Sequence, residues 1–229
     1  MRKKIVWMGG IAILGLALSG LAAWAQDEAT TAAEKAVDQQ DPDAVDPNLI
    51  KGEKWTLDFT FERPEPILIT TPEGEKKVYW YVVYTVTNKT GAEREFVPLF
   101  TLYSDTTTVQ KAGMHPWVFD KIKKSRRIPF LENAVKMIGK ILPGEDNART
   151  GVAIFEPLDR KTDAFTIFVA GLSGEYIEKE NPAAKEDTPE DQKIVRLRKT
   201  LALTYKLPGD EWWLNLDQPL FVSKKWTWR

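Results

Sequence analysis

The stretch VYWYVVYTVTNKTG, Val78 to Gly91, decides the fold of this chain. In an extended strand, alternate side chains point to opposite faces. One face then carries Val78, Trp80, Val82, Tyr84 and Val86. The other face carries Tyr79, Tyr81, Val83, Thr85 and Thr87. Because both sets are largely apolar, the strand is predicted to be central in its sheet and covered on both faces.

Further strand patterns lie on either side of this stretch. Residues 54–62, KWTLDFTFE, alternate apolar and polar side chains and predict one half-buried strand. PILITT and a turn at 72–75 follow, which predicts a long hairpin with the central strand. REFVPLFTLYSD, 94–105, is predicted as one strand in which Pro98 marks an edge position or a bulge. Other strands are predicted within 106–110, 139–156, 163–174, 193–210 and 218–229.

Two segments depart from the strand pattern. A helical insertion is predicted from about Met114 to Ile138, because Pro116 occupies a helix-starting position ahead of regularly spaced apolar residues. Residues 129–139, PFLENAVKMIG, are interpreted as a second short helical piece. The polar run from about 175 to 192 predicts an exposed, mobile charged loop.

About eight strands and one helical insertion predict an all-β domain over residues 53–229, with a β-sandwich as the architecture. A small barrel is the alternative, since strand count alone does not separate the two. Residues 26–52 contain no aromatic side chain, and most of their charged side chains are acidic, which is typical of a disordered acidic tether. The tether is interpreted as a plain spacer or as an acidic interaction tail.

The first residues predict export. Met1–Lys4 is positively charged, Ile5–Ala22 is apolar, and Ala23-Trp24-Ala25 fits a cleavage site, so residues 1–25 are interpreted as a signal peptide. An uncleaved anchor is the alternative, because about 18 apolar residues can just span a bilayer. Cleavage would leave 29 basic residues against 33 acidic ones and no transmembrane segment. We expect a periplasmic or extracellular protein that does not bind nucleic acid.

Asn88-Lys89-Thr90 matches the acceptor pattern for N-glycosylation. Asparagine and glycine tolerate the left-handed backbone conformations that turns require. Because the export signal is of bacterial type, we interpret Asn88 and Gly91 as the turn that ends the central strand, and not as a sugar site.

Several motifs occur in a familiar order: YVVYTVTNKTG, FVPLFTLYSD, ILPGEDNARTGVAIFE and FTIFVAGLSG. This order resembles the immunoglobulin-like domains of exported bacterial proteins, including the FxLYD-type and telokin-like domains. The closing RKTLALTYKLPGDEWW and KKWTWR resemble a family of uncharacterised secreted bacterial proteins. The resemblance covers roughly Trp55 to Arg229 and implies an immunoglobulin-like β-sandwich without implying a catalytic residue. The helical insertion and the C-terminal strand pair depart from a minimal immunoglobulin layout and leave the strand order open.

Catalytic and metal-binding motifs are not found in the sequence. His115 is the only histidine, there is no cysteine, and no G-x-S-x-G occurs, which argues against a nucleophilic triad and against zinc, copper or haem. The acidic run at 38–46 lacks EF-hand spacing, and no glycine-rich phosphate loop follows a strand. Acidic pairs at 145–146 and 210–211 each follow a Leu-Pro-Gly turn. We expect no enzyme activity and no cofactor; a hydrolase with an unrecognised carboxylate pair is the remote alternative.

Two sets of residues are predicted to form an interaction surface. Trp212 and Trp213 follow a turn, and neighbours in an extended segment point to opposite faces, so we expect at least one of them to be exposed. They are interpreted as a binding feature, with packing at the edge of the domain as the alternative. The second set is a basic run made of Lys121, Lys123, Lys124, Arg126 and Arg127. This run is interpreted as a contact for an anionic envelope polymer or lipid headgroups, or as a solvated helix face.

The sequence therefore predicts a non-enzymatic, envelope-associated interaction or structural module. Its expected partner is another envelope protein, bound at an edge strand or at the helical insertion. A carbohydrate-binding β-sandwich that uses exposed tryptophans is the alternative.

Overall fold

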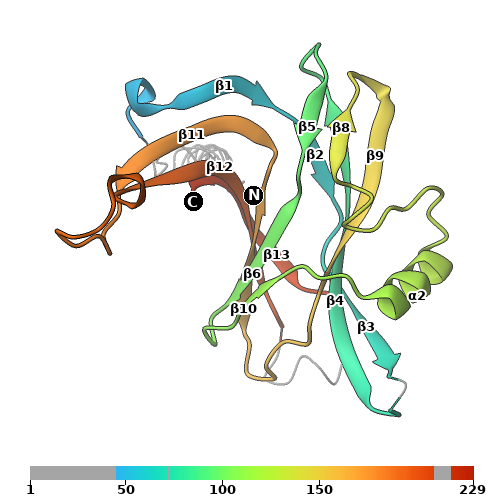
Figure 1. Cartoon of the computed structure of the whole chain (residues 1–229). Helices are drawn as coiled ribbons and strands as arrows, with labels where there is room; N and C mark the ends of the chain where they lie inside the picture. Colours follow the sequence, from blue (N-terminus) through green and yellow to red (C-terminus); the bar gives the residue numbers. More distant parts are fainter. Residues whose placement is uncertain (1–44, 72, 209–217) are drawn as a thin grey trace, which may run out of the picture. The chain divides into compact units, whose positions relative to one another are not determined.

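A computed structural model describes residues 45–71, 73–208 and 218–229, and shows a β-sandwich in which a seven-stranded sheet packs against a four-stranded one (Figure 1). The predicted sandwich is confirmed. The predicted signal peptide, most of the tether, Trp212 and Trp213 lie outside the described residues. Within the described ranges, no helix is both long enough and apolar enough to cross a membrane.

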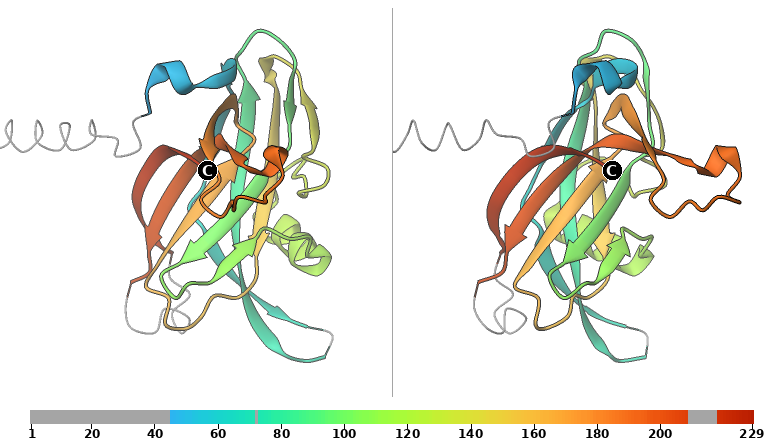
Figure 2. Two further views of the ribbon diagram at one scale, coloured as in Figure 1. Left: turned by 60° about the vertical axis from the view of Figure 1, so that its left-hand side comes forward. Right: turned by 90° about the vertical axis from the view of Figure 1, so that its left-hand side faces the viewer.

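The larger sheet is organised around one long strand, β12. Its strands are β1 (Lys51–Thr56), β6 (Leu99–Ser104), β7 (Val109–Lys111), β10 (Ala164–Ala170), β11 (Ser173–Glu180), β12 (Ile194–Lys206) and β13 (Leu220–Trp228). The first part of β12 pairs with β11, and the second part pairs with β10. β13 also pairs with the second part of β12, so β10 and β13 lie along opposite edges of β12. β1 extends the sheet beyond β11, and β6 and β7 extend it beyond β10 (Figure 2).

The smaller sheet has the predicted central strand in its middle. It contains β2 (Asp58–Phe61), β3 (Glu65–Thr70), β4 (Lys76–Asn88) and β9 (Gly144–Phe155). β9 pairs with β4 along 80–86, and β2 and β3 pair with residues of the same stretch, so β2 and β3 share the other edge of β4. A separate ladder joins β5 (Arg94–Phe96) to β8 (Gly139–Ile141).

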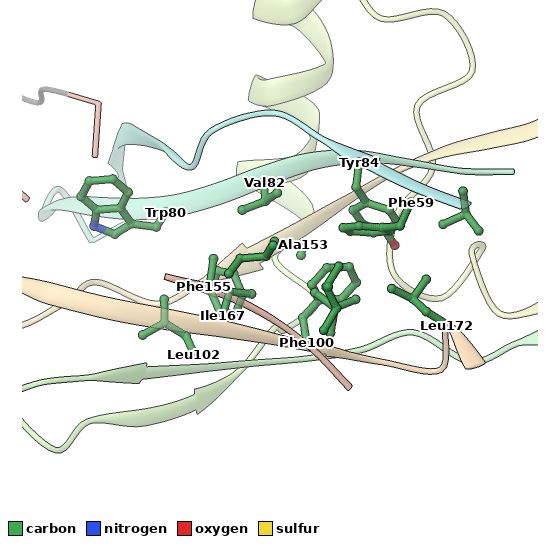
Figure 3. Packing of buried hydrophobic residues seen from close by; sticks show 14 of the residues in the cluster. Phe59, Trp80, Val82, Tyr84, Phe100, Leu102, Ala153, Phe155, Ile167 and Leu172 are labelled. Carbon is green, nitrogen blue, oxygen red and sulfur yellow. The ribbon is translucent and has the colours of Figure 1, made fainter. Parts of the chain in front are cut away.

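Both faces of β4 are covered, as its sequence predicts. Trp80 and Tyr84 point into the main core between the sheets (Figure 3). There Tyr84 lies against Phe100 of β6, and Trp80 lies against Phe165 of β10. On the other face, Tyr81 and Val83 belong to a second apolar cluster. Helix α2 (Pro116–Arg126) covers this cluster and contributes the buried side chains of its apolar stripe (Figure 1). The predicted helix is thus confirmed.

The turn after β4 is built on Asn88, whose side chain is fully buried. Its amide donates to the carbonyls of Ala92 and Ile141, both at 2.8 Å. Its Oδ1 accepts from the backbone N–H and the hydroxyl of Thr90. The glycosylation acceptor pattern is therefore part of a closed hydrogen-bonded turn, and its asparagine is inaccessible in the folded chain.

Two predicted strands are each divided by the tertiary structure. The segment 54–62 splits at Leu57, because β1 pairs with β11 in the larger sheet whereas β2 pairs with β4 in the smaller one. Leu57 joins the two layers, and its N–H donates to the carbonyl of Leu172. The segment 94–105 splits around Val97 and Pro98, since β5 pairs with β8 and β6 pairs with β10.

Three predictions about irregular segments are corrected. Residues 129–138 form turns and a β-bridge at Glu132, and not a second helix, and Gly139 begins β8. Phe130 has a left-handed φ of 59° that interrupts helical geometry. The predicted loop at 175–192 begins only after Glu180, because β11 pairs with β12; the short 3-10 turn η2 (Glu190–Gln192) closes it. The domain starts before residue 53: the 3-10 turn η1 (Pro47–Leu49) and the first residues of β1 fall within the predicted tether.

Candidate functional site

The predicted basic run does not form one free cationic surface. Arg126 donates to Glu65 at 2.7 Å and also to Glu62, so its guanidinium joins α2 to the smaller sheet. Lys121 donates to the carbonyl of Leu68 at 2.7 Å. These two cations hold the helix in place. The remaining members, Lys123, Lys124 and Arg127, are exposed.

A groove of about 280 Å³ lies where β1, β11 and β12 meet, and we name it the aromatic groove. Its walls include Trp55, Glu95, Tyr176, Arg196 and Arg198. β-Pairing brings these residues together, because Lys51 of β1 lies opposite Tyr176, and Tyr176 in turn lies opposite Arg198 of β12. Residues far apart in the sequence thus line one surface.

Two glycines allow the aromatic rings to lie close against the strands. A Cβ atom at Gly174 would stand 2.7 Å from the indole Cε2 of Trp55 and 2.7 Å from the carbonyl oxygen of Glu53. A Cβ atom at Gly52 would stand 2.9 Å from the ring of Tyr176, and Gly52 has a left-handed φ of +88°. Side chains larger than hydrogen are therefore excluded at both positions.

Cations flank both rings. The guanidinium carbon of Arg94 lies 5.3 Å from the centre of the Trp55 ring, and that of Arg196 lies 4.2 Å from the centre of the Tyr176 ring. Both distances fall within the range of cation–π attraction. The aromatic groove therefore combines flat apolar surface with oriented positive charge.

The charges of the groove are only partly neutralised. Arg94 pairs with Glu53 at 2.6 Å, and Arg196 approaches Glu178 at 3.4 Å. The hydrogen bond from Lys51 lowers the pKa of Glu178, which keeps this carboxylate ionised. Arg198 is exposed and has no ion pair among the described residues, and it lines the groove together with the carboxylate of Glu95.

The groove was missed by sequence reasoning because its residues were divided among segments with different interpretations. Tyr176 and Glu178 fall within the predicted mobile loop, whereas Trp55 falls within the predicted half-buried strand at 54–62. The available signal was the alternation of apolar and polar side chains over 195–198, which predicts a half-buried strand; residues 175–180 carry no such alternation. Only Gly171 and Leu172 separate β10 from β11, and Gly174 lies within β11, so the pair of glycines does not end the strand pattern as the sequence suggested.

The residues singled out for chemistry lie apart from this groove. His115 sits before α2 with its ring 5.1 Å from that of Tyr79, and its Nε2 lies 3.5 Å from Glu156. Glu145 is exposed near Lys89, and the pair at 210–211 lies outside the described residues. In the part of the chain that the structure describes, no group of three His, Asp or Glu side chains is arranged to hold a metal ion.

Compared with known proteins, the chain matches no protein family, no curated protein and no solved structure. The β-sandwich follows from the strand pairing itself. The resemblance to immunoglobulin-like domains and to a family of secreted bacterial proteins stays a prediction.

Proposed function

We propose that this protein is a non-enzymatic interaction module of the cell envelope, and that a partner protein binds at the aromatic groove. The observation that carries this proposal is the position of Arg198, which forms no ion pair with any residue in the described part of the chain and lies opposite Tyr176 in a groove lined by aromatic side chains. Tyrosine, tryptophan and arginine are the residues that dominate binding energy at protein interfaces. The envelope location rests on the predicted export signal.

The edge of β1 supports the same function. Among the described strands, β1 pairs only with β11, which leaves its second edge without a strand partner. An extended segment of a partner can add to such an edge through main-chain hydrogen bonds, while neighbouring pockets select its side chains. Arg196 and Arg198 lie on β12, two strands in from this edge, so a partner that also fills the aromatic groove would present acidic side chains there.

A carbohydrate ligand is the second candidate, since Trp55 and Tyr176 both line the groove. Aromatic rings bind sugars through their faces, and each of these rings already has a guanidinium within 5.3 Å. A sugar would have to displace Arg94 or Arg196 in order to stack. Binding of the wild-type protein on a glycan array, lost in Tyr176→Ala, would favour this candidate over a protein partner.

Site-specific crosslinking in cells tests the primary proposal. A photoreactive amino acid at Glu95, which lines the groove, is expected to capture a discrete partner, whereas the same group at the exposed Lys206 is not. Adding Arg198→Glu should abolish the product, and the matched charge reversal Lys206→Glu should leave it unchanged. With the captured partner purified, Arg198→Glu should weaken binding at least about 30-fold, which corresponds to about 2 kcal/mol. Identical products from both crosslinker positions, or a product insensitive to Arg198→Glu, would reject the groove as the interface.

A further inference from the structure

The insertion between β7 and β9 differs in charge from the rest of the protein. Residues 114–142, which we name the basic insertion, contain seven Lys and Arg residues and two Asp and Glu residues, a net charge of +5. The whole chain has a net charge of −1, so the remainder carries −6. Such an asymmetry creates a local positive field that attracts an anionic partner.

The basic insertion also exposes large apolar side chains. They are Met114, Trp117, Phe130, Val135, Ile138 and Leu142. Trp117 is 67% exposed and Phe130 is 90% exposed. Single apolar residues on a surface are ordinary, but several of them next to clustered cations mark a place of contact.

The geometry of α2 directs part of this set away from the protein. Val118 and Ile122 are buried against the smaller sheet, so the opposite side of the helix faces solvent. Trp117 and Lys124 are seven residues apart, which places them two helical turns apart on that outer side. Figures 1 and 2 show α2 and the chain that follows it lying together on the outer side of the smaller sheet.

The turn after α2 holds its exposed aromatic side chain in an uncommon backbone conformation. Phe130 has a φ of 59°, and Arg127 at the end of α2 has a φ of 51°. A left-handed conformation costs free energy for residues other than glycine, and it persists only where the surroundings impose it. Buried Leu131 and the backbone bonds between Glu132 and β9 impose it here, and they leave Phe130 projecting into solvent.

We propose that the basic insertion binds the surface of a membrane that contains anionic phospholipids. Trp117 and Phe130 enter the boundary between headgroups and acyl chains, where aromatic side chains are stable. Lys123, Lys124 and Arg127 pair with lipid phosphates, since none of the three is used to fasten α2 to the sheet. An anionic polymer would satisfy these charges and leave the apolar side chains in water, which favours the membrane.

Vesicle flotation with the full chain tests the charge requirement. We expect stronger binding to vesicles that contain phosphatidylglycerol than to vesicles of phosphatidylcholine alone. In the triple variant Lys123→Gln, Lys124→Gln and Arg127→Gln, the affinity for phosphatidylglycerol vesicles relative to phosphatidylcholine vesicles should fall roughly 100-fold at low salt, about fivefold for each cation. The matched control Lys161→Gln, Lys185→Gln and Lys206→Gln removes the same charge elsewhere on the exposed surface and should have little effect.

A depth measurement separates the basic insertion from any contribution of residues 1–44. The chain has no cysteine, so Val135→Cys and Lys185→Cys each accept one environment-sensitive dye. In anionic vesicles, the dye at position 135 should shift to the blue and be quenched by brominated acyl chains, and the dye at position 185 should do neither. Equal loss of binding in both triple variants, binding indifferent to lipid charge, or an unquenched dye at position 135 would each overturn the proposal.

Discussion

Replacing Asn88 by alanine is expected to lower the free energy of unfolding of the sandwich by about 3–4 kcal/mol. The buried side chain makes four hydrogen bonds, two as donor and two as acceptor. Removal of the amide donor from the buried contact with Ile141 costs about 1–3 kcal/mol. The three partly buried bonds add about 0.5 kcal/mol or more each, because water replaces them incompletely.

Chemical denaturation measures this change as a shift in midpoint at constant slope. For a domain of this size, 3–4 kcal/mol corresponds to a fall of about 10 °C in melting temperature. Asn147→Ala is the matched control: its amide donates to the Pro143 carbonyl at 2.8 Å from an exposed position, and the expected loss is below about 1 kcal/mol. If Asn88→Ala and Asn147→Ala lost equal free energy of unfolding, burial of the Asn88 hydrogen bonds would not be the reason for their contribution to stability.

Asn88→Asp adds a pH dependence with a defined sign. The new carboxylate would be buried and would face the Ala92 and Ile141 carbonyls, so its pKa in the folded state is raised above the ordinary value of about 4. The loss of folding stability relative to wild type is then largest above the folded-state pKa of the introduced carboxyl group. This loss shrinks as the pH falls through that pKa, because the protonated acid can donate one hydrogen bond again. A stability difference from wild type that grows on acidification would contradict this assignment.

Three further predictions concern the helix, the groove and a core tyrosine. Ile122→Ala empties a fully buried position and should lose about 2–4 kcal/mol in urea unfolding, whereas Trp117→Ala on the outer side of α2 should lose less than about 0.5 kcal/mol; comparable losses would contradict the assigned faces. Gly174→Ala places a methyl group against Trp55, so we expect a loss of about 1–3 kcal/mol and a red-shifted tryptophan emission, and an unchanged spectrum would argue against the tight contact. Burial raises the pKa of Tyr84 above its ordinary value of about 10, so stability should fall as the pH rises beyond 10, and less steeply in Tyr84→Phe.

Local patterns were sufficient wherever the structure depends on neighbouring residues. The alternation through Lys76–Asn88 predicted a central strand covered on both faces, because side-chain alternation is a property of the extended backbone. The helix after Pro116 followed from its start signal and the spacing of its apolar residues. The false helix at 129–139 shows the limit. Of its large apolar residues only Leu131 and Met137 are buried, and the turns hold Phe130 in a left-handed conformation that interrupts helical geometry.

The sequence by itself determined the β class, the position of β4 and the positive charge of the insertion. Only the tertiary structure decided where the chain crosses from one sheet to the other at Leu57, and that Arg126 is bound to the smaller sheet while Arg127 remains exposed. It also decided that Trp55 and Tyr176 line one groove. The reason is physical: alternation and charge are properties of adjacent residues. Strand pairing joins distant segments, as far apart as Lys51 and Tyr176 in β1 and β11, and it depends on the packing of the whole core.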